Sequence, residues 1–289
     1  MDRKNIRLGL IQHPCVEDVQ QNQKRILARI REAAGEGAQI ILLQELFNTI
    51  YFCQRIDDQF FDWAQPIPGP LSNSLCKLAK ELDIVIVAPF FERRAAGIYH
   101  NSLIVVDADG TLMGTYRKKH IPDDPSFYEK YYFTPGEDEY QVFDTKYAKI
   151  GTLICWDQWY PEAARITALK GAELLVYPTA IGTLPDESGQ ISEEYRDAWQ
   201  TVQRSHAIAN GCFVACINRV GQEADITFWG QSFVTGPFGR VLAQAGREEE
   251  VLYTEIDLSK IEKQRQTWPF FRDRRIDTYQ PLLKRFIDQ

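Results

Sequence analysis

Short apolar runs alternate with segments of helical periodicity along the chain. The first run covers about residues 6–12, and Ile26, Ile30 and Ala33 then recur at a helical spacing before a second run at 39–44. Runs of this length predict buried strands, and the repeat between them predicts a helix that packs against those strands. This order is typical of an α/β domain.

The same alternation continues to the end of the chain. We expect a helix after Pro70, a strand at 84–88, a hairpin closed by the turn at 107–110, a helix at 161–170 before Gly171, a strand at 173–177, a helix at 193–210 stopped by Gly211, and strands at 212–217 and 251–256. No linker interrupts the pattern, which favours one domain over residues 1–289. Periodicity alone permits two sheets packed face to face or one doubly wound sheet.

Cys155 ends the apolar run at 150–154 and precedes a turn in which Pro161 can open a helix. Backbone N–H groups at such a turn can meet an anionic intermediate, so the position suits a nucleophile. A lone cysteine is nevertheless more often a small buried side chain, and Cys155 needs partners that could activate it.

Two ionisable residues supply those partners. Glu45 follows the strand at 39–44, and Lys118 follows the second strand of the expected hairpin. A carboxylate can take the proton of a thiol and later that of a water molecule, while an ammonium group can stabilise an oxyanion. Each charge alone would be read as a solvated strand end, but with Cys155 they suit attack on a carbonyl or nitrile carbon.

Composition excludes several other classes of function. The formal net charge of −7 argues against nucleic acid as the main partner, and it fits cationic substrates weakly. The four histidines are scattered and no Cys-x-x-Cys pair occurs, so no metal is expected. Cys212 and Cys216 fall on one face of a strand, where core packing explains them. No glycine-rich phosphate loop is present.

The start of the chain and the cysteines indicate a reducing, cytoplasmic setting. Residues 1–5 lead directly into a strand without a signal peptide, and no apolar run is long enough to span a bilayer. The six cysteines are scattered through a long chain, unlike the disulfide framework of a small secreted domain.

Three segments resemble the catalytic motifs of the nitrilase superfamily of carbon–nitrogen hydrolases. They are 43–47 around Glu45, 116–122 around Lys118 and 153–157 around Cys155, in the chain order of that family's Glu-Lys-Cys triad. The resemblance runs over nearly the whole chain. It implies a four-layer αββα sandwich, catalytic roles for these three residues, and no cofactor.

A narrower resemblance is to the N-carbamoylputrescine amidohydrolase branch of that superfamily. It rests on the segments 120–125, 127–136, 177–182 and 268–275. The resemblance implies a small carbamoyl amine as substrate, hydrolysed to ammonia, carbon dioxide and a free amine. Amidases acting on N-carbamoyl-β-alanine or on a simple ω-amide stay open as alternatives, as does a catalytically silent binding homologue.

The resemblance also suggests residues that bind the substrate. Glu129 lies in a loop that could cap the site, where related amidases use a second glutamate to orient the substrate. The motif positions that could line the pocket are Tyr51, Trp156, Thr179 and Ala180. Lys119 competes with Lys118 for the lysine role, but the motif favours Lys118 and leaves Lys119 as a solvated loop residue.

Acidic residues cluster near the expected site and would suit a distal ammonium group. They are Asp123, Asp124, Asp186, Glu187, Glu193 and Glu194. Leu184 stands where relatives in the branch often have a polar or acidic residue, which leaves the contact to the amine open. A carboxylate-bearing substrate would call for arginine or lysine instead.

The C-terminal segment from about 262 to 289 falls outside the expected core elements. Its stretch at 268–275 combines arginines with large apolar rings. So many apolar rings are poorly suited to contact with solvent. Segments of this kind join subunits in the family that the chain resembles, so we expect a homodimer or a larger homo-oligomer. The alternative is that the segment folds back on its own domain.

Overall fold

The computed structural model describes residues 5–187 and 189–288, and its frame is a pair of mixed six-stranded sheets. The first sheet has the order β15-β1-β2-β3-β4-β5. Its strands are β1 (Asn5–Gln12), β2 (Ile40–Leu43), β3 (Val85–Ala95), β4 (Ile98–Val106), β5 (Leu112–Arg117) and β15 (Glu250–Asp257). The strands β1, β2 and β3 are parallel to one another, and antiparallel strands extend the sheet on both sides.

The second sheet has the order β14-β13-β10-β8-β7-β6 and a similar mixture of directions. Its strands are β6 (Val142–Asp144), β7 (Lys149–Thr152), β8 (Leu174–Pro178), β10 (Phe213–Ile217), β13 (Phe233–Thr235) and β14 (Val241–Gln244). A small third sheet, in the order β11-β12-β9, consists of β9 (Gly182–Thr183), β11 (Val220–Glu223) and β12 (Ile226–Trp229).

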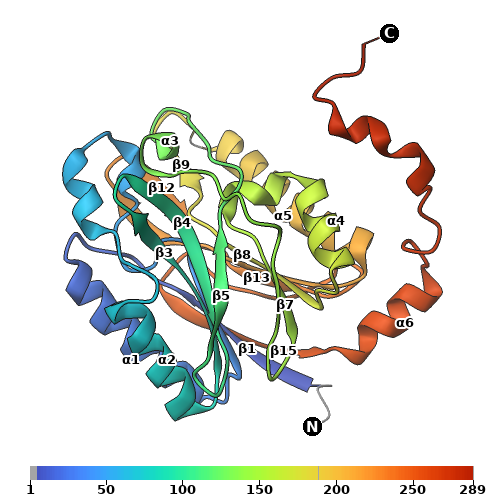
Figure 1. The fold of residues 1–289 in the computed structure, drawn as a ribbon, viewed down its shortest axis with the longest axis horizontal. Helices are drawn as coiled ribbons and strands as arrows, with labels where there is room; N and C mark the ends of the chain where they lie inside the picture. The colour runs from blue at the N-terminus through green and yellow to red at the C-terminus, as the bar shows by residue number, and fades with distance from the viewer. Residues whose placement is uncertain (1–4, 188, 289) are drawn as a thin grey trace.

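Helices cover the outer face of each six-stranded sheet. The helices α1 (Val19–Gly35) and α2 (Pro70–Leu82) pack on the first sheet, and α4 (Pro161–Leu169) and α5 (Gln190–Asn210) pack on the second (Figure 1). The remaining helices are short: α3 (Glu129–Tyr132), α6 (Ser259–Thr267) and the 3₁₀ turns η1 (Phe52–Gln54), η2 (Asp58–Trp63), η3 (Cys155–Trp159), η4 (Ile276–Thr278) and η5 (Gln280–Leu283). No helix among the described residues is long and apolar enough to cross a membrane.

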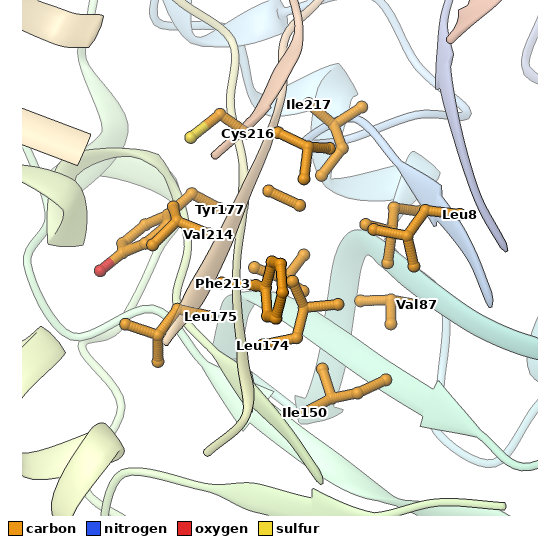
Figure 2. Packing of buried hydrophobic residues seen from close by; sticks show 14 of the residues in the cluster. Leu8, Val87, Ile150, Leu174, Leu175, Tyr177, Phe213, Val214, Cys216 and Ile217 are labelled. Atoms are coloured by element: carbon orange, nitrogen blue, oxygen red, sulfur yellow. The ribbon is translucent and has the colours of Figure 1, made fainter. Parts of the chain in front are cut away.

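The inner faces of the two six-stranded sheets form the main core. Leu8 and Val87 from the first sheet face Ile150 and Leu174 from the second (Figure 2). Strand residues alternate between faces, so the same strands also present apolar side chains to the helices outside. The layers follow the order helix, sheet, sheet, helix, which confirms the expected four-layer αββα sandwich.

Two expected boundaries were wrong for identifiable reasons. The third strand was expected to stop at residue 88, but β3 continues to Ala95 in its pairing with β4. Pro89 is tolerated because the parallel pairing with β2 ends at Val87, so no ladder bond is lost on that side. Helix α5 begins at Gln190 rather than at 193. The sequence pattern does not reveal its first turn, because that turn is mostly exposed and carries no apolar repeat.

The chain after α6 projects away from the layers of the domain, in red at the right of the view (Figure 1). Many of its large apolar side chains are exposed, among them Leu283 at 89% and Phe286 at 77%. The first part of the expected C-terminal segment therefore belongs to α6. Trp268 then stacks on Phe238 and Arg165 lies over the Phe271 ring, while residues 275–288 are exposed. Gln289 is outside the described residues, as are residues 1–4.

Candidate active site

Glu45, Lys118 and Cys155 come from the ends of three different strands and meet between the two sheets. Glu45 follows β2, Lys118 follows β5, and Cys155 begins η3 shortly after β7. Glu45 and Lys118 are fully buried, and Cys155 is 6% exposed. Glu45 and Lys118 lie close enough to Cys155 for their charges to act on its thiol.

Lys118 is bound by two carboxylates. Its Nζ donates to Glu45 Oε1 at 2.9 Å and to Glu129 Oε2 at 2.6 Å. Asn101 Nδ2 donates to the same Glu45 oxygen at 2.7 Å, and Tyr51 Oη donates to Glu129 Oε1 at 2.7 Å. These contacts hold the ammonium group in one place, which suits a group that must stabilise a developing charge.

The second carboxylate oxygen of Glu45 is different. Oε2 is buried and has no hydrogen-bond partner among the described residues. A buried polar atom without a partner is costly, and such atoms in native structures call for an explanation. An unoccupied acceptor beside a thiol is what a general base requires, because it can take the proton as the sulfur attacks.

The backbone at Cys155 is held in an uncommon conformation, with φ at +39°. This geometry turns the chain sharply between β7 and η3, and strain of this kind gathers at functional sites. Burial raises the pKa of the Cys155 thiol, and the backbone N–H of Ala180, which donates to the sulfur, opposes that rise slightly. Cys155 is therefore held by its own turn and by the loop after β8.

Asp157 holds that turn from the other side. Its carboxylate accepts from the backbone N–H groups of Ile154 at 3.0 Å and His120 at 3.1 Å. It also accepts from Tyr116 Oη and lies 2.7 Å from the Nδ1 atom of His120. Because Tyr116 and His120 flank Lys118 in the sequence, Asp157 ties the turn bearing Cys155 to the segment bearing Lys118.

Burial shapes the protonation states of the site. Burial raises the pKa of the Cys155 thiol well above its ordinary value, and Glu45 raises it further, against the opposing charge of Lys118. Burial would lower the pKa of Lys118, but the carboxylates of Glu129 and Glu45 outweigh it and raise that pKa. The resting pair is therefore a neutral thiol and an ammonium ion, and the thiol needs a base during attack.

Glu129 shares one cation with Glu45. Burial raises the pKa of Glu129 to about 7, with the nearby Glu45 carboxylate adding to the rise and Lys118 opposing it. Two buried carboxylates beside a single ammonium group leave one net negative charge, which favours uptake of a proton near neutral pH. Glu129 is thus positioned to respond to the pH range in which most enzymes work.

A cavity of about 500 Å³ opens onto Cys155 and Glu129. Its lining residues are Pro122, Asp124, Pro125, Phe127, Glu129, Cys155, Trp156, Gln158, Trp159, Ala180, Ile181, Gly182, Leu184, Asp186, Glu187, Tyr195, Ala198 and Trp229. The wall is mostly apolar and aromatic, carries four acidic residues, and includes no lysine or arginine among the lining residues. Such a cavity suits a small molecule with a cationic end.

A larger hollow of about 770 Å³ lies beside this cavity and shares Leu184 and Trp229 with it. Its lining residues include none of Glu45, Lys118, Glu129 and Cys155. The chemistry therefore points to the smaller cavity as the candidate site.

The expected pocket residues separate into two groups. Trp156 and Ala180 lie on the wall of the cavity beside Cys155. Tyr51 and Thr179 do not line it: Tyr51 contacts Glu129, and the Thr179 hydroxyl donates to Gln158 Oε1 at 3.2 Å. Both side chains are buried, and neither is among the residues that line the cavity.

Lys119 points away from the site. Its ammonium group donates to the carbonyl oxygens of Gly136 and Asp138 and lies 5.2 Å from the centre of the Tyr140 ring. Lys119 is half-buried rather than a freely solvated loop lysine, so that expectation needs correction. Its contacts leave Lys118 as the lysine beside Glu45.

Sequence reasoning missed several residues that shape the site. Asn101, Asp157, Gln158 and Arg219 are buried and bind the functional segments directly. Arg219 follows the apolar strand β10 as Glu45 follows β2, so the same signal of a charge at a strand end was present. The residues missed on the wall, Trp159, Tyr195 and Trp229, are brought there only by the tertiary fold.

Among the described residues, no group of histidine, cysteine, aspartate and glutamate side chains is arranged to hold a metal ion. Cys212 and Cys216 are buried in the core, as the strand pattern predicts. All six cysteines are free thiols.

Comparison with known proteins shows similarity to carbon-nitrogen hydrolases over nearly the whole chain. Residues 7–266 match the family model described as carbon-nitrogen hydrolase. N-carbamoylputrescine amidase of Solanum lycopersicum is 48% identical over 98% of this chain and 97% of its own length. Citrullinase of Francisella tularensis subsp. tularensis is 42% identical over 98% of this chain and 99% of its own length. The carbon-nitrogen hydrolase from Helicobacter pylori G27 has a TM-score of 0.95 and 45% identity, covering 98% of this chain and 100% of that one.

Proposed function

The chain belongs to the carbon-nitrogen hydrolase family of the nitrilase superfamily, and from that premise we propose that it hydrolyses N-carbamoylputrescine. It is a hydrolase of carbon–nitrogen bonds. The products of the proposed reaction are putrescine, carbon dioxide and ammonia. The observation that carries the proposal is a cavity that joins Cys155 and Glu129 to an acidic, aromatic wall without lysine or arginine among its lining residues.

The first half of the reaction forms a bond between sulfur and carbon. Glu45 Oε2 takes the thiol proton while Cys155 Sγ attacks the ureido carbon, and the carbonyl oxygen becomes an oxyanion beside the Lys118 ammonium group. Collapse of this intermediate breaks one carbon–nitrogen bond. The proton held by Glu45 passes to the departing nitrogen, so ammonia or the amine leaves neutral and a thiocarbamate stays on Cys155.

The second half of the reaction hydrolyses the thiocarbamate and restores the Cys155 thiol. Glu45 accepts a proton from water as the water oxygen attacks the thiocarbamate carbon, and the Cys155 sulfur leaves with a proton. The released carbamic acid loses carbon dioxide and frees the second nitrogen compound. Lys118 and Glu129 keep their ion pair through both halves, so the oxyanion position is prepared before each attack.

The acidic lining of the cavity supports an amine rather than a carboxylate tail. Asp124, Asp186 and Glu187 line the cavity, and Tyr195 and Trp229 add aromatic faces that attract cations. Glu187 also accepts from the backbone N–H of Leu184 at 2.9 Å, which holds this loop in place. A carboxylate tail here would meet like charge with no cation among the lining residues to receive it.

Citrulline is a second candidate substrate, because the citrullinase is 42% identical over 98% of this chain. Its ureido group would meet Cys155 in the same way, but its α-carboxylate would face the acidic wall. N-carbamoyl-β-alanine and simple ω-amides share that difficulty. A silent binding homologue would have no need of the charged set around Cys155.

The proposal is tested by comparing kcat/KM for N-carbamoylputrescine, citrulline, N-carbamoyl-β-alanine and glutamine at one pH and one salt concentration. N-carbamoylputrescine is expected to be hydrolysed fastest. Asp186→Asn is expected to raise KM for N-carbamoylputrescine more than KM for a neutral N-carbamoyl alkylamine, with Glu17→Gln, which does not line this cavity, as a control. Preference for citrulline or N-carbamoyl-β-alanine would overturn the assignment of the amine.

We also propose a cytoplasmic setting, as a single domain that forms at least a homodimer. Free cysteines in all six positions support the reducing compartment. The family model ends at residue 266, and the exposed apolar chain that follows is suited to pack against a second copy.

A further inference from the structure

Arg219 is fully buried between β10 and β11, and no part of the reaction proposed above uses it. Its guanidinium group faces the loop that follows β2. Nη2 donates to the carbonyl oxygens of Glu45 at 3.0 Å and Leu46 at 2.9 Å, and Nη1 donates to the carbonyl oxygen of Thr49 at 2.9 Å. One side chain therefore satisfies three carbonyl groups of a single loop.

Those carbonyl groups belong to a backbone that needs such support. Leu46 has a positive φ of 50°, which bends the chain directly after Glu45. Buried carbonyl oxygens require donors, and the planar fork of arginine supplies several in a fixed arrangement. Arg219 therefore supports the backbone of Glu45 at the point where the chain turns away from β2.

Glu223 holds Arg219 and the far end of the same loop. Its Oε1 accepts from Arg219 Nη1 at 2.6 Å, and its Oε2 accepts from the backbone N–H of Tyr51 at 2.5 Å. Tyr51 in turn donates to Glu129. The buried ion pair of Arg219 and Glu223 therefore holds this loop at two points. Arg219 binds the backbone of Glu45, and Glu223 binds the backbone of Tyr51, whose side chain contacts Glu129.

The neighbouring Asn218 connects this ion pair to the wall of the cavity. Its Oδ1 accepts from the backbone N–H of Ile181 at 3.0 Å and from that of Arg219 at 2.8 Å, and its Nδ2 donates to the Ile181 carbonyl at 2.9 Å. Ile181 lines the cavity next to Ala180. The segment at 218–219 thus holds the wall beside Cys155 and the loop bearing Glu45 in one frame.

We propose that Arg219, fixed by Glu223, is the positioning residue that keeps Glu45 aligned with Cys155 and Lys118. This inference rests on the proposed function, because it assigns Glu45 the role of base. Arg219 touches neither substrate nor the reacting atoms, and its effect passes through the backbone of Glu45. A base that is displaced by about an ångström loses much of its catalytic effect, so the alignment of Glu45 contributes to the rate as well as its charge.

The test uses Arg219→Lys, which keeps the charge but replaces the fork with a single ammonium group that cannot reach all three carbonyls and Glu223 together. Arg29→Lys is the matched control: Arg29 also binds a glutamate, Glu249, but on the outer helix α1. Folding is followed by far-UV circular dichroism and thermal unfolding. We expect kcat for Arg219→Lys to fall about 10²-fold with KM little changed, and the control to match the parent.

A second readout does not depend on turnover. Iodoacetamide alkylation of Cys155, measured by mass spectrometry of its peptide, reports how readily the thiol gives up its proton. In the parent, where Glu45 is aligned with the thiol, the rate of alkylation should change little from about pH 7 to about pH 9. In Arg219→Lys it should be slower at neutral pH and rise roughly tenfold per pH unit, because only the small thiolate fraction then reacts.

The outcomes separate this inference from the proposed function. A parent enzyme that fails to hydrolyse N-carbamoylputrescine overturns that function, while the alkylation profile still tests Arg219. A folded Arg219→Lys with parental kcat and a parental alkylation profile overturns the positioning role, as does an activity loss that only follows the unfolded fraction. If Arg219→Lys does not fold, Glu223→Gln takes its place: a lower kcat with the steeper alkylation profile supports the role, and parental behaviour overturns it.

Discussion

The Nζ atom of Lys118 lies 2.9 Å from Glu45 Oε1, on the same carboxylate whose other oxygen has no partner among the described residues. One oxygen of Glu45 is thereby committed to the ion pair and the other stays available for a proton. This division lets a single carboxylate orient the lysine and serve Cys155 at the same time.

Replacing Glu45 with glutamine should leave a folded protein with little activity. The amide keeps the size of the side chain but cannot act as a base, so turnover should fall by about 10²–10⁴-fold. Ammonia release and far-UV circular dichroism measure the two effects. Activity close to that of the parent would transfer the role of base to another carboxylate, with Glu129 as the first candidate.

Lys118→Ala should be far more damaging than Lys119→Ala. Lys118 is bound to Glu45 and Glu129, whereas Lys119 binds backbone carbonyls outside the site. Loss of an oxyanion partner should cost about 10²–10³-fold in kcat. Leaving two buried carboxylates without their cation should also lower the free energy of unfolding by about 3–5 kcal/mol.

The neighbouring lysine serves as the control for that experiment, since its replacement should change kcat little. Activity and thermal unfolding of both variants would be measured side by side. The reverse order of damage would contradict the assignment of Lys118. Equal activity losses in two folded variants would contradict it as well.

Activity should depend on pH through Glu129, whose pKa burial raises to about 7. Below that pH the carboxyl gains a proton and weakens its ion pair with Lys118, so kcat/KM should fall as pH decreases through about 7. Glu129→Gln removes the titrating group, and the limb near pH 7 should disappear at a lower overall rate. A parental limb retained in that variant would show that another group controls it.

The sequence could place Glu45, Lys118 and Cys155 in the fold because each stands at the end of a recognisable strand. Glu45, Lys118 and Cys155 follow β2, β5 and β7, and the buried strands before them were visible as apolar runs. The core residues were equally accessible, since apolar runs mark the buried strands and helical repeats mark the faces that pack on them. The count of layers came from the family resemblance, not from periodicity.

What the sequence did not reveal depends on contacts between distant segments. Arg219 meets Glu45 across more than half the chain, and nothing local marks such a pairing. The positive φ at Cys155 and Leu46 is likewise imposed by the surrounding fold, because both are residue types that ordinarily avoid it. Tyr51 and Thr179 were expected on the pocket wall because the sequence does not show in which direction their side chains point.

The exposed C-terminal chain should hold two copies together. Leu282, Leu283, Phe286 and Ile287 are each more than half exposed, and burying such side chains against a second copy is favourable. Sedimentation at micromolar concentration should show at least a dimer. A version ending at residue 267 should dissociate while keeping its secondary structure, and a full-length protein that sediments only as a monomer would contradict the interface.

The central claim is that Cys155 carries out hydrolysis of N-carbamoylputrescine, and its most direct test compares the parent with Cys155→Ala. Ammonia and putrescine release from this substrate would be measured alongside far-UV circular dichroism of both proteins. The thiol is small, so its loss should cost little packing while removing the nucleophile. The account predicts release of both products by the parent and none by a folded variant; equal release by the two proteins would contradict it.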